Sequence, residues 1–205
     1  RPPVTPNQIT IGAALLGLLG VALVSSGGAA FMVWGFFLMH MQSILDGCDG
    51  ELARVRFQQS AFGEWLDTFV DDGLHILLFA GTGVGLFRAT GSSLALAAGL
   101  LAAGMHAAYD VVAARELRLQ GEGEIIKLHW HLAGRSDMKS RVARGRRDPL
   151  VYAYTLGRRD FFILSFLVYA LLGVPWLALI HALFIAGALA AVAGTQAVWR
   201  LRGGR

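Results

Sequence analysis

The chain has 205 residues, of which 55 % are hydrophobic and only 16 % charged, and its formal net charge is +4. Its mean hydropathy of +0.55 excludes an ordinary soluble domain and predicts an integral membrane protein. The single cysteine, Cys48, excludes an intrachain disulfide, and the composition indicates membrane lipid rather than nucleic acid as a partner.

The apolar stretches predict an all-α fold of six transmembrane helices. A juxtamembrane N-terminal segment precedes the first helix, where Thr5 is a suitable N-cap and Pro6 a suitable first helical residue. A polar and basic loop over residues 115–159 separates the fourth helix from the fifth. The 26 glycines, scattered through the helices, are typical of close helix packing in a membrane. The expected helices cover residues 8–24, 29–56, 61–87, 94–114, 160–173 and 175–197.

The positive charges predict how these helices are oriented. With six helices, both chain ends and the loops after the second and fourth helices lie on one side of the membrane. That side carries 17 of the 18 Lys and Arg residues, and only Arg88 lies on the other. Because cytoplasmic loops carry the excess of Lys and Arg, we expect both termini and the 115–159 loop in the cytoplasm. We also expect residues 1–205 to be one membrane domain excised from a longer protein, since the chain begins at Arg1 rather than at methionine.

Four carboxylates lie where the second and third helices meet the basic side of the membrane. Asp46 and Asp49 are three residues apart, and Asp67 and Asp71 are four apart, so each pair shares a helix face. A lone carboxylate in an apolar helix is also explained by a hydrogen bond to a neighbouring helix. Four of them at this spacing favour a function, because ionisable groups are costly inside a membrane. Oxygen ligands alone suit a hard divalent ion, Mg²⁺, Mn²⁺ or Ca²⁺, rather than zinc.

The stretch over residues 46–71 resembles the signature of the CDP-alcohol phosphotransferases. At typical residue usage its eight fixed positions match by chance about once in 10⁹ starting positions. The resemblance implies a homodimeric, divalent-metal-dependent membrane enzyme that transfers the phosphoalcohol group of a CDP-alcohol to an acceptor alcohol and releases CMP. The matching residues are Asp46, Asp49, Gly50, Ala53, Arg54, Gly63, Asp67 and Asp71.

The same resemblance implies roles for individual residues. It makes Asp46, Asp49, Asp67 and Asp71 ligands of Mg²⁺ or Mn²⁺, in a two-metal site, and Asp71 the general base as well. Asn7 lies in a Thr-Pro-Asn segment that the family often carries, although a simple helix cap explains it equally well. The expected CDP-binding residues are Asn7, Asp49, Gly50, Ala53, Arg54, Gly63 and Asp67.

Most basic residues of the 115–159 loop are explained by attraction to anionic lipid, at about 1 kcal/mol per charge. Others lie where the fourth and fifth helices enter the membrane. Family members that use a phosphorylated acceptor, such as inositol phosphate or glycerol phosphate, bind that phosphate with arginines and lysines of this region. The Gly-Arg-Arg-Asp-Phe-Phe segment from Gly157 also resembles the inositol-phosphate branch, which is often fused to a cytosolic nucleotidyltransferase. The expected acceptor-binding residues are Arg115, Lys139, Arg158 and Arg159.

Some polar residues within the expected helices are outside the motif. His75, one turn after the last motif acid, either orients that acid or forms an interhelix hydrogen bond. His106, Tyr109 and Asp110 share one face of the fourth helix and either line the cavity or bond to a neighbouring helix. Asp72 points about 100° away from the last motif acid, towards a helix interface.

A different class of function is a divalent-cation transporter, because four acids in a membrane can line an ion path. Such a path would continue across the bilayer, but beyond His75 the third helix offers no ionisable residue before Arg88. Arg54 would also repel a cation. The enzyme is therefore the favoured interpretation, while the identity of the acceptor stays open, as does the choice between a lipid-linked and a soluble donor.

Overall fold

The computed structural model describes residues 6–55, 57, 61–120 and 157–203, with the side chains at 6, 49, 50, 53, 54, 61, 62, 64–66 and 120 outside that description. The described residues form six α-helices and no strand, which confirms the all-α prediction. The helices are α1 Pro6–Ser26, α2 Ala29–Val55, α3 Ala61–Thr90, α4 Ser93–Gln120, α7 Arg159–Leu171 and α8 Trp176–Leu201.

Five of the described helices, all except α7, are long and apolar enough to cross a membrane. The helix α7 has 13 residues and therefore rises about 20 Å, less than the ~30 Å of a hydrocarbon core. It ends two residues before its expected limit at residue 173. Gly173 has a φ of +73°, and the amide of Val174 donates to the carbonyl of Tyr169 at 2.9 Å. A glycine with positive φ is a common way to end a helix.

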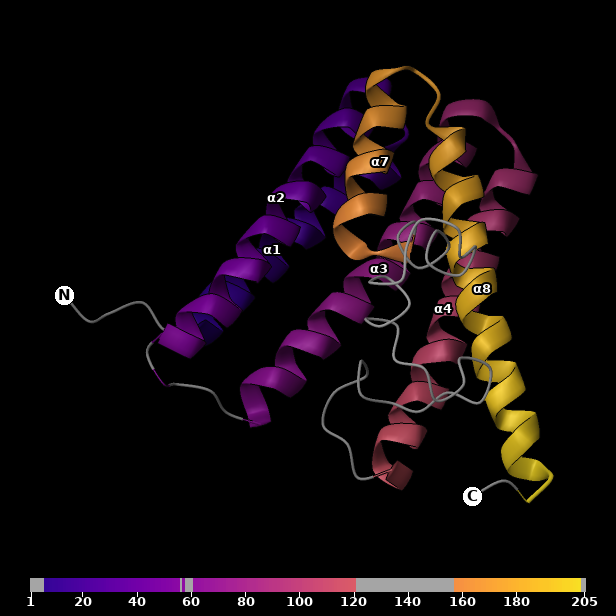
Figure 1. Cartoon of the computed structure of the whole chain (residues 1–205). Coiled ribbons are helices and arrows are strands. Elements are labelled where there is room, and N and C mark those ends of the chain that lie inside the picture. The colour runs from indigo at the N-terminus through magenta and orange to yellow at the C-terminus, as the bar shows by residue number, and fades with distance from the viewer. Residues whose placement is uncertain (1–5, 56, 58–60, 121–156, 204–205) are drawn as a thin grey trace, which may run out of the picture.

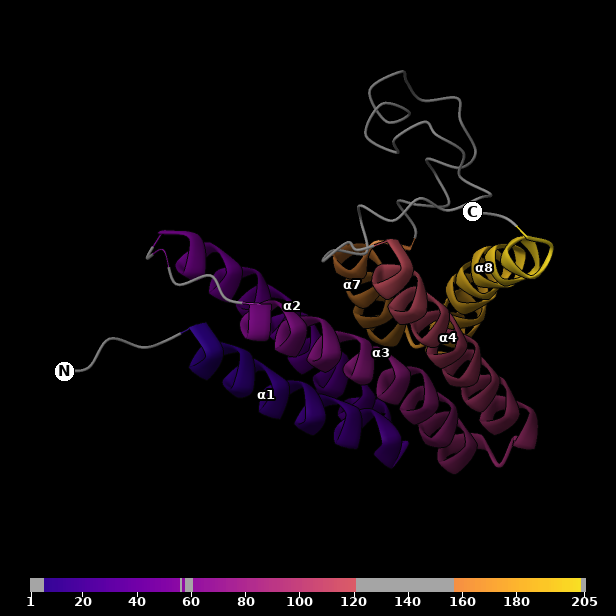
Figure 2. The same cartoon turned by 90° about the horizontal axis from the view of Figure 1, so that it is seen from below.

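The helices form one bundle with α3 near its middle (Figures 1 and 2). On one side α3 contacts α1, which packs against α2, and on the other it contacts α4, which packs against α8. The short α7 lies against α2 and leads into α8. Both helices that carry the motif, α2 and α3, are therefore held by neighbours in the bundle.

Glycines allow the close approach that the composition predicted. A Cβ on Gly20 of α1 would lie 2.8 Å from the carbonyl oxygen of Gly35 in α2. A Cβ on Gly99 of α4 would lie 2.6 Å from the Cα of Gly83 in α3. Only residues without a side chain fit at these contacts, as is common where membrane helices pack backbone to backbone.

An aromatic cluster fixes the position of α7. The Phe166 ring lies 5.7 Å from that of Phe36 in α2 and 6.2 Å from that of Phe79 in α3, measured between centroids. The ring of Phe162, one turn earlier in α7, lies 5.6 Å from that of Phe166. Since Arg159 comes three residues before Phe162, it lies on the same helix face and points towards α2 and α3.

Candidate active site

Three of the four motif acids lie together between α2 and α3. One carboxylate oxygen each from Asp46, Asp67 and Asp71 lies within 4.8 Å of the others. Each acid continues a buried helix face, since Asp46 follows the buried Gln42 by one turn and Asp71 precedes the buried Leu74 by one turn. Packing of these faces turns the acids towards one another rather than towards lipid. We call Asp46, Asp67 and Asp71 the acid cluster.

The guanidinium group of Arg159 lies among these acids. Its Nη1 is 2.5 Å from Asp46 Oδ2, and it donates a hydrogen bond to Asp71 Oδ2. The side chains are 26 % exposed for Arg159, 16 % for Asp71 and 4 % for Asp46, so the group is largely removed from water. A cation shared between two carboxylates offsets the repulsion that they would otherwise have in a medium of low polarity.

Uncharged and surface groups surround this ion pair. Gln42, which is 1 % exposed, donates from Nε2 to Asp71 Oδ1 at 3.3 Å. The hydroxyl of Ser43 donates to Asp160 Oδ1 at 3.3 Å, and Arg158 donates to Asp160 Oδ2 at 3.4 Å. Gln42 was not among the expected site residues, although an amide one turn before a motif acid in an apolar helix was a usable signal.

The acid cluster includes a carboxylate oxygen that a cation could satisfy. Asp46 Oδ1 is buried and accepts no hydrogen bond from the part of the chain that the structure describes. A buried carboxylate oxygen without a donor is costly, and a bound cation would satisfy it. All the ligand atoms offered here are carboxylate oxygens, which hard divalent ions prefer. The residues present therefore fit the divalent-metal site expected from the sequence.

The other residues expected to bind the donor lie in α1, α2 and α3. Asn7 is partly buried in the first turn of α1, and Gly63 lies in the first turn of α3. Lys139, which was expected to bind the acceptor, lies outside the described residues. Four motif residues fall within the last two turns of α2, with their side chains outside the described part, and these are Asp49, Gly50, Ala53 and Arg54.

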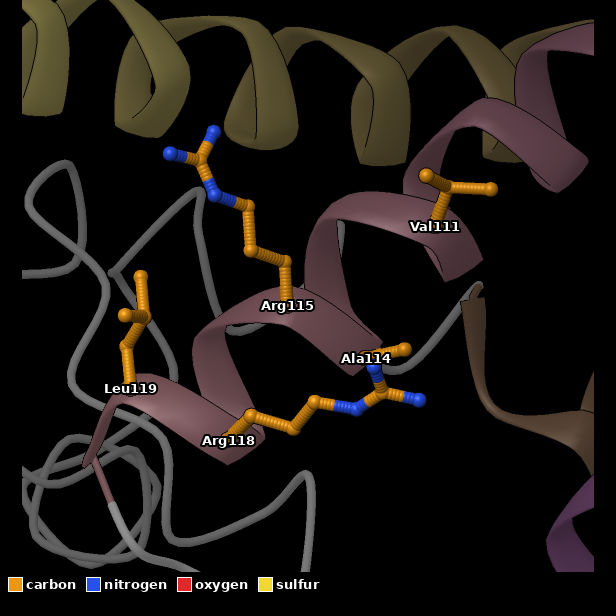
Figure 3. A pocket seen from close by; sticks show the side chains of 5 residues that line it. All are labelled: Val111, Ala114, Arg115, Arg118 and Leu119. Atoms are coloured by element: carbon orange, nitrogen blue, oxygen red, sulfur yellow. The ribbon is translucent and has the colours of Figure 1, made fainter.

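Arg115 lies near the end of α4 and lines a pocket there (Figure 3). In that view its guanidinium group and that of Arg118 extend from α4 in different directions. The Arg115 side chain is exposed, and among the interactions of the described residues none joins it to the acid cluster. Of the three expected acceptor-binding residues that the structure describes, Arg159 is thus the one brought to the acids. The pocket is lined by Val111, Ala114, Arg115, Arg118 and Leu119.

Comparison with known proteins agrees with the expected family. Three relatives are each named bifunctional IPC transferase and DIPP synthase. The one from Rubrobacter xylanophilus is 36 % identical over 97 residues, which is 47 % of this chain and 21 % of the relative. That from Aquifex aeolicus is 43 % identical over 67 residues, 33 % of this chain and 15 % of the relative. That from Thermococcus kodakarensis is 40 % identical over 82 residues, 38 % of this chain and 18 % of the relative.

The matched segment therefore spans about a fifth or less of the length of these curated relatives. The family model described as CDP-alcohol phosphatidyltransferase matches residues 3–133, which is more than half of the chain and includes the whole motif. The chain belongs to the CDP-alcohol phosphatidyltransferase family.

Proposed function

We propose that this chain transfers the phosphoalcohol group of a CDP-alcohol to the hydroxyl group of a phosphorylated acceptor, with release of CMP. The observation that carries the proposal is the convergence of Asp46, Asp67 and Asp71 within 4.8 Å of one another, at the motif positions of the family. The cationic Arg159 beside them suits substrates that carry phosphate. A cation transporter is the weaker alternative, because the comparisons give it no support.

We propose that the resident cofactor is Mg²⁺ or Mn²⁺, held by the acid cluster together with Asp49. The unsatisfied Oδ1 of Asp46 and the oxygen-only ligand set support a hard ion. When bound there, two such ions would neutralise the donor's pyrophosphate and stabilise the attacking and leaving oxygens. Through the ions, the acids would thus bind the donor's pyrophosphate as well as promote the transfer step.

Asp71 is the proposed general base. The acceptor hydroxyl gives its proton to the Asp71 carboxylate while its oxygen bonds to the phosphorus that carries the donor alcohol. The bond from that phosphorus to the bridging pyrophosphate oxygen breaks, and its electron pair leaves with CMP. Gln42 and Arg159 each donate to one oxygen of Asp71 and so hold the carboxylate in place. Each oxygen keeps a second lone pair on which the proton can be received.

The donor's CMP portion is proposed to lie against the ends of α1, α2 and α3. Glycines and an alanine at these positions leave space for a ligand close to the backbone, and Arg54 is a fixed cation suited to the donor phosphates. The proposed contacts are Asn7, Asp49, Gly50, Ala53, Arg54, Gly63 and Asp67.

The acceptor's phosphate is proposed to bind Arg159, with Arg158, Arg115 and Lys139 as further candidates. A guanidinium group has five N–H donors, so Arg159 can hold a phosphate while Nη1 stays beside Asp71. That arrangement would bring the acceptor hydroxyl to the base. The names of the relatives and their inositol-phosphate branch support inositol phosphate over glycerol phosphate as the acceptor.

The remaining proposals concern the protein in its membrane. The charge distribution supports a site that opens towards the cytoplasm, with both termini and the 115–159 loop on that side. We propose that residues 1–205 act as one membrane domain, surrounded by lipid and paired with a second copy as the family resemblance implies.

The test is an assay of CMP release by the purified chain in detergent or lipid discs. Donors would include CDP-diacylglycerol and CDP-inositol, and acceptors would include inositol phosphate and glycerol phosphate, each beside its unphosphorylated alcohol. We expect CMP only with donor, phosphorylated acceptor and Mg²⁺ or Mn²⁺ together. Full turnover in excess chelator, or equal use of unphosphorylated acceptors, would contradict the proposal.

A further inference from the structure

We propose a second metal site, between α3 and α4, formed by Asp72, His75 and His106. The site would bind a divalent transition-metal ion of borderline softness, and Zn²⁺ is taken as the representative. None of its three residues belongs to the motif, so the site does not depend on the proposed function.

The three side chains meet across the α3–α4 interface. Asp72 and His75 are three residues apart on one face of α3, and His106 faces them from α4. One ligand atom from each lies within 4.8 Å of the others. The rings of His75 and His106 lie edge to face, 5.8 Å apart between centroids.

The packing of the two helices holds this arrangement in register. The contact between Gly83 and Gly99 leaves no room for a Cβ and therefore fixes α3 against α4. Gly83 lies about two turns after His75, and Gly99 lies two turns before His106. In an antiparallel pair, the register that places one glycine on the other also places one histidine beside the other.

Unsatisfied polar atoms at this place point to a missing partner. His106 is 6 % exposed, yet neither of its ring nitrogens has a hydrogen-bond partner within the described ranges. The same holds for both carboxylate oxygens of Asp110, of which Oδ1 lies 3.9 Å from His106 Nε2. The other neighbours are aromatic, since Phe79 lies 5.5 Å from the His106 ring and Phe162 lies 5.1 Å from the His75 ring. A buried imidazole with both nitrogens unsatisfied is costly, and a metal ion would satisfy one of them.

The ligand types distinguish this site from the acid cluster. Two imidazole nitrogens and one carboxylate oxygen suit zinc and its neighbours, whereas Mg²⁺ prefers oxygen ligands only. Ligand atoms at ~2.0–2.1 Å from a tetrahedral zinc lie about 3.4 Å from one another. The three ligand atoms here lie within 4.8 Å of one another, so side-chain shifts of about 1 Å would bring them onto one ion. Asp110 supplies a further carboxylate beside His106. The ion would bind α3 to α4 one residue away from the proposed base, Asp71.

The test is metal binding by the purified full chain, measured in excess Mg²⁺ so that the acid cluster is occupied. Bound metal is first removed with a chelator, and the excess Mg²⁺ is then supplied. Zn²⁺ is added in competition with a chromophoric chelator, and the bound zinc is counted by elemental analysis. Co²⁺ is used as a spectroscopic substitute for Zn²⁺. We expect one tight Zn²⁺ per chain, a tetrahedral Co²⁺ spectrum and a higher thermal midpoint. His106→Gln should weaken Zn²⁺ binding at least about 100-fold, because outer-shell partners alone are worth 10–100-fold.

Two matched variants separate this site from its surroundings. His181→Gln alters a histidine of equal burial to His75, at 8 % exposure each, outside the site, and should bind Zn²⁺ like the wild type. Asp46→Asn alters the acid cluster and should also keep the tight Zn²⁺. If His106→Gln fails to fold, as judged by its elution profile and helical circular dichroism, Asp72→Asn is the deciding variant. Wild-type protein without tight Zn²⁺, unchanged binding in the deciding variant, or loss of the ion in Asp46→Asn instead would overturn the proposal.

Discussion

Arg159→Ala is expected to change metal binding and acceptor use in opposite directions. In the structure Arg159 supplies the positive charge that Asp46 and Asp71 share. A divalent ion bound to the same acids has to compete with that charge. The variant removes the competitor, and it also removes the proposed ligand of the acceptor's phosphate.

Both magnitudes can be worked from the contacts. Removing one partner of a buried ion pair leaves the other charge unpaired, at a cost of about 3–5 kcal/mol in free energy. Because the Arg159 side chain is 26 % exposed, we discount this to about 1–2 kcal/mol, which is a 5- to 30-fold gain in metal affinity when the competitor is gone. A hydrogen bond to a charged group is worth about 1.5–3 kcal/mol, so use of the acceptor should fall roughly ten- to a hundredfold.

The assay combines calorimetric titration of Mn²⁺ into the substrate-free protein with CMP release at varied acceptor and saturating donor. Arg88→Ala is the control, because Arg88 is an exposed arginine in the last turn of α3 that donates to the backbone carbonyl of Ser25 and lies outside the proposed sites, so it should leave both quantities within about twofold. Donor affinity should be the same in all three proteins. If Mn²⁺ affinity and acceptor KM stay unchanged in Arg159→Ala while donor affinity falls, Arg159 serves the donor and the reasoning is refuted.

Asp71→Asn removes the proposed base, so CMP release should fall by about 10²–10⁴-fold while CDP binding persists in a titration; wild-type turnover would exclude this assignment. Lys139→Cys, in a background without the native cysteine, should stay unlabelled when intact cells are treated with an impermeant thiol reagent, and labelling from outside would reverse the orientation. Gly99→Ala places a Cβ 2.6 Å from the Cα of Gly83, and overpacking of about 1–3 kcal/mol should lower the thermal midpoint in detergent. Gly104→Ala is the control on the same helix, where an added Cβ meets nothing within 4 Å, so equal destabilisation by both would contradict the close-contact argument.

The helices and the motif acids could be predicted because both are local signals. A run of about 20 apolar residues is enough to indicate a membrane helix. The spacing from Asp67 to Asp71 defines a shared helix face without any knowledge of the neighbours. The second and third helices were both expected to meet the basic side of the membrane, which placed their four acids together. The fifth helix was expected over 160–173, and α7 covers Arg159–Leu171.

The position of Arg159 could not be predicted in the same way. It lies 88 residues after Asp71 in the sequence, and the segment between them carries no periodic signal that would fix the distance. What brings Arg159 to the acids is the packing of Phe162 and Phe166 between α2 and α3. Such contacts depend on which aromatic rings fit together in the folded bundle, which the hydropathy of α7 does not specify.

Helix phase explains why neighbouring residues of the same type differ here. Successive residues of a helix point about 100° apart, and Arg159 faces the acid cluster while Arg158 lies at the exposed surface. On α3 the same rotation separates Asp71, which meets α2 and α7, from Asp72, which meets His106 of α4. Neither pair can therefore be treated as one unit. Because α3 is packed on both sides, one turn of it presents an oxygen-only cluster to one neighbour and a histidine-containing cluster to the other, and the two should select different metal ions.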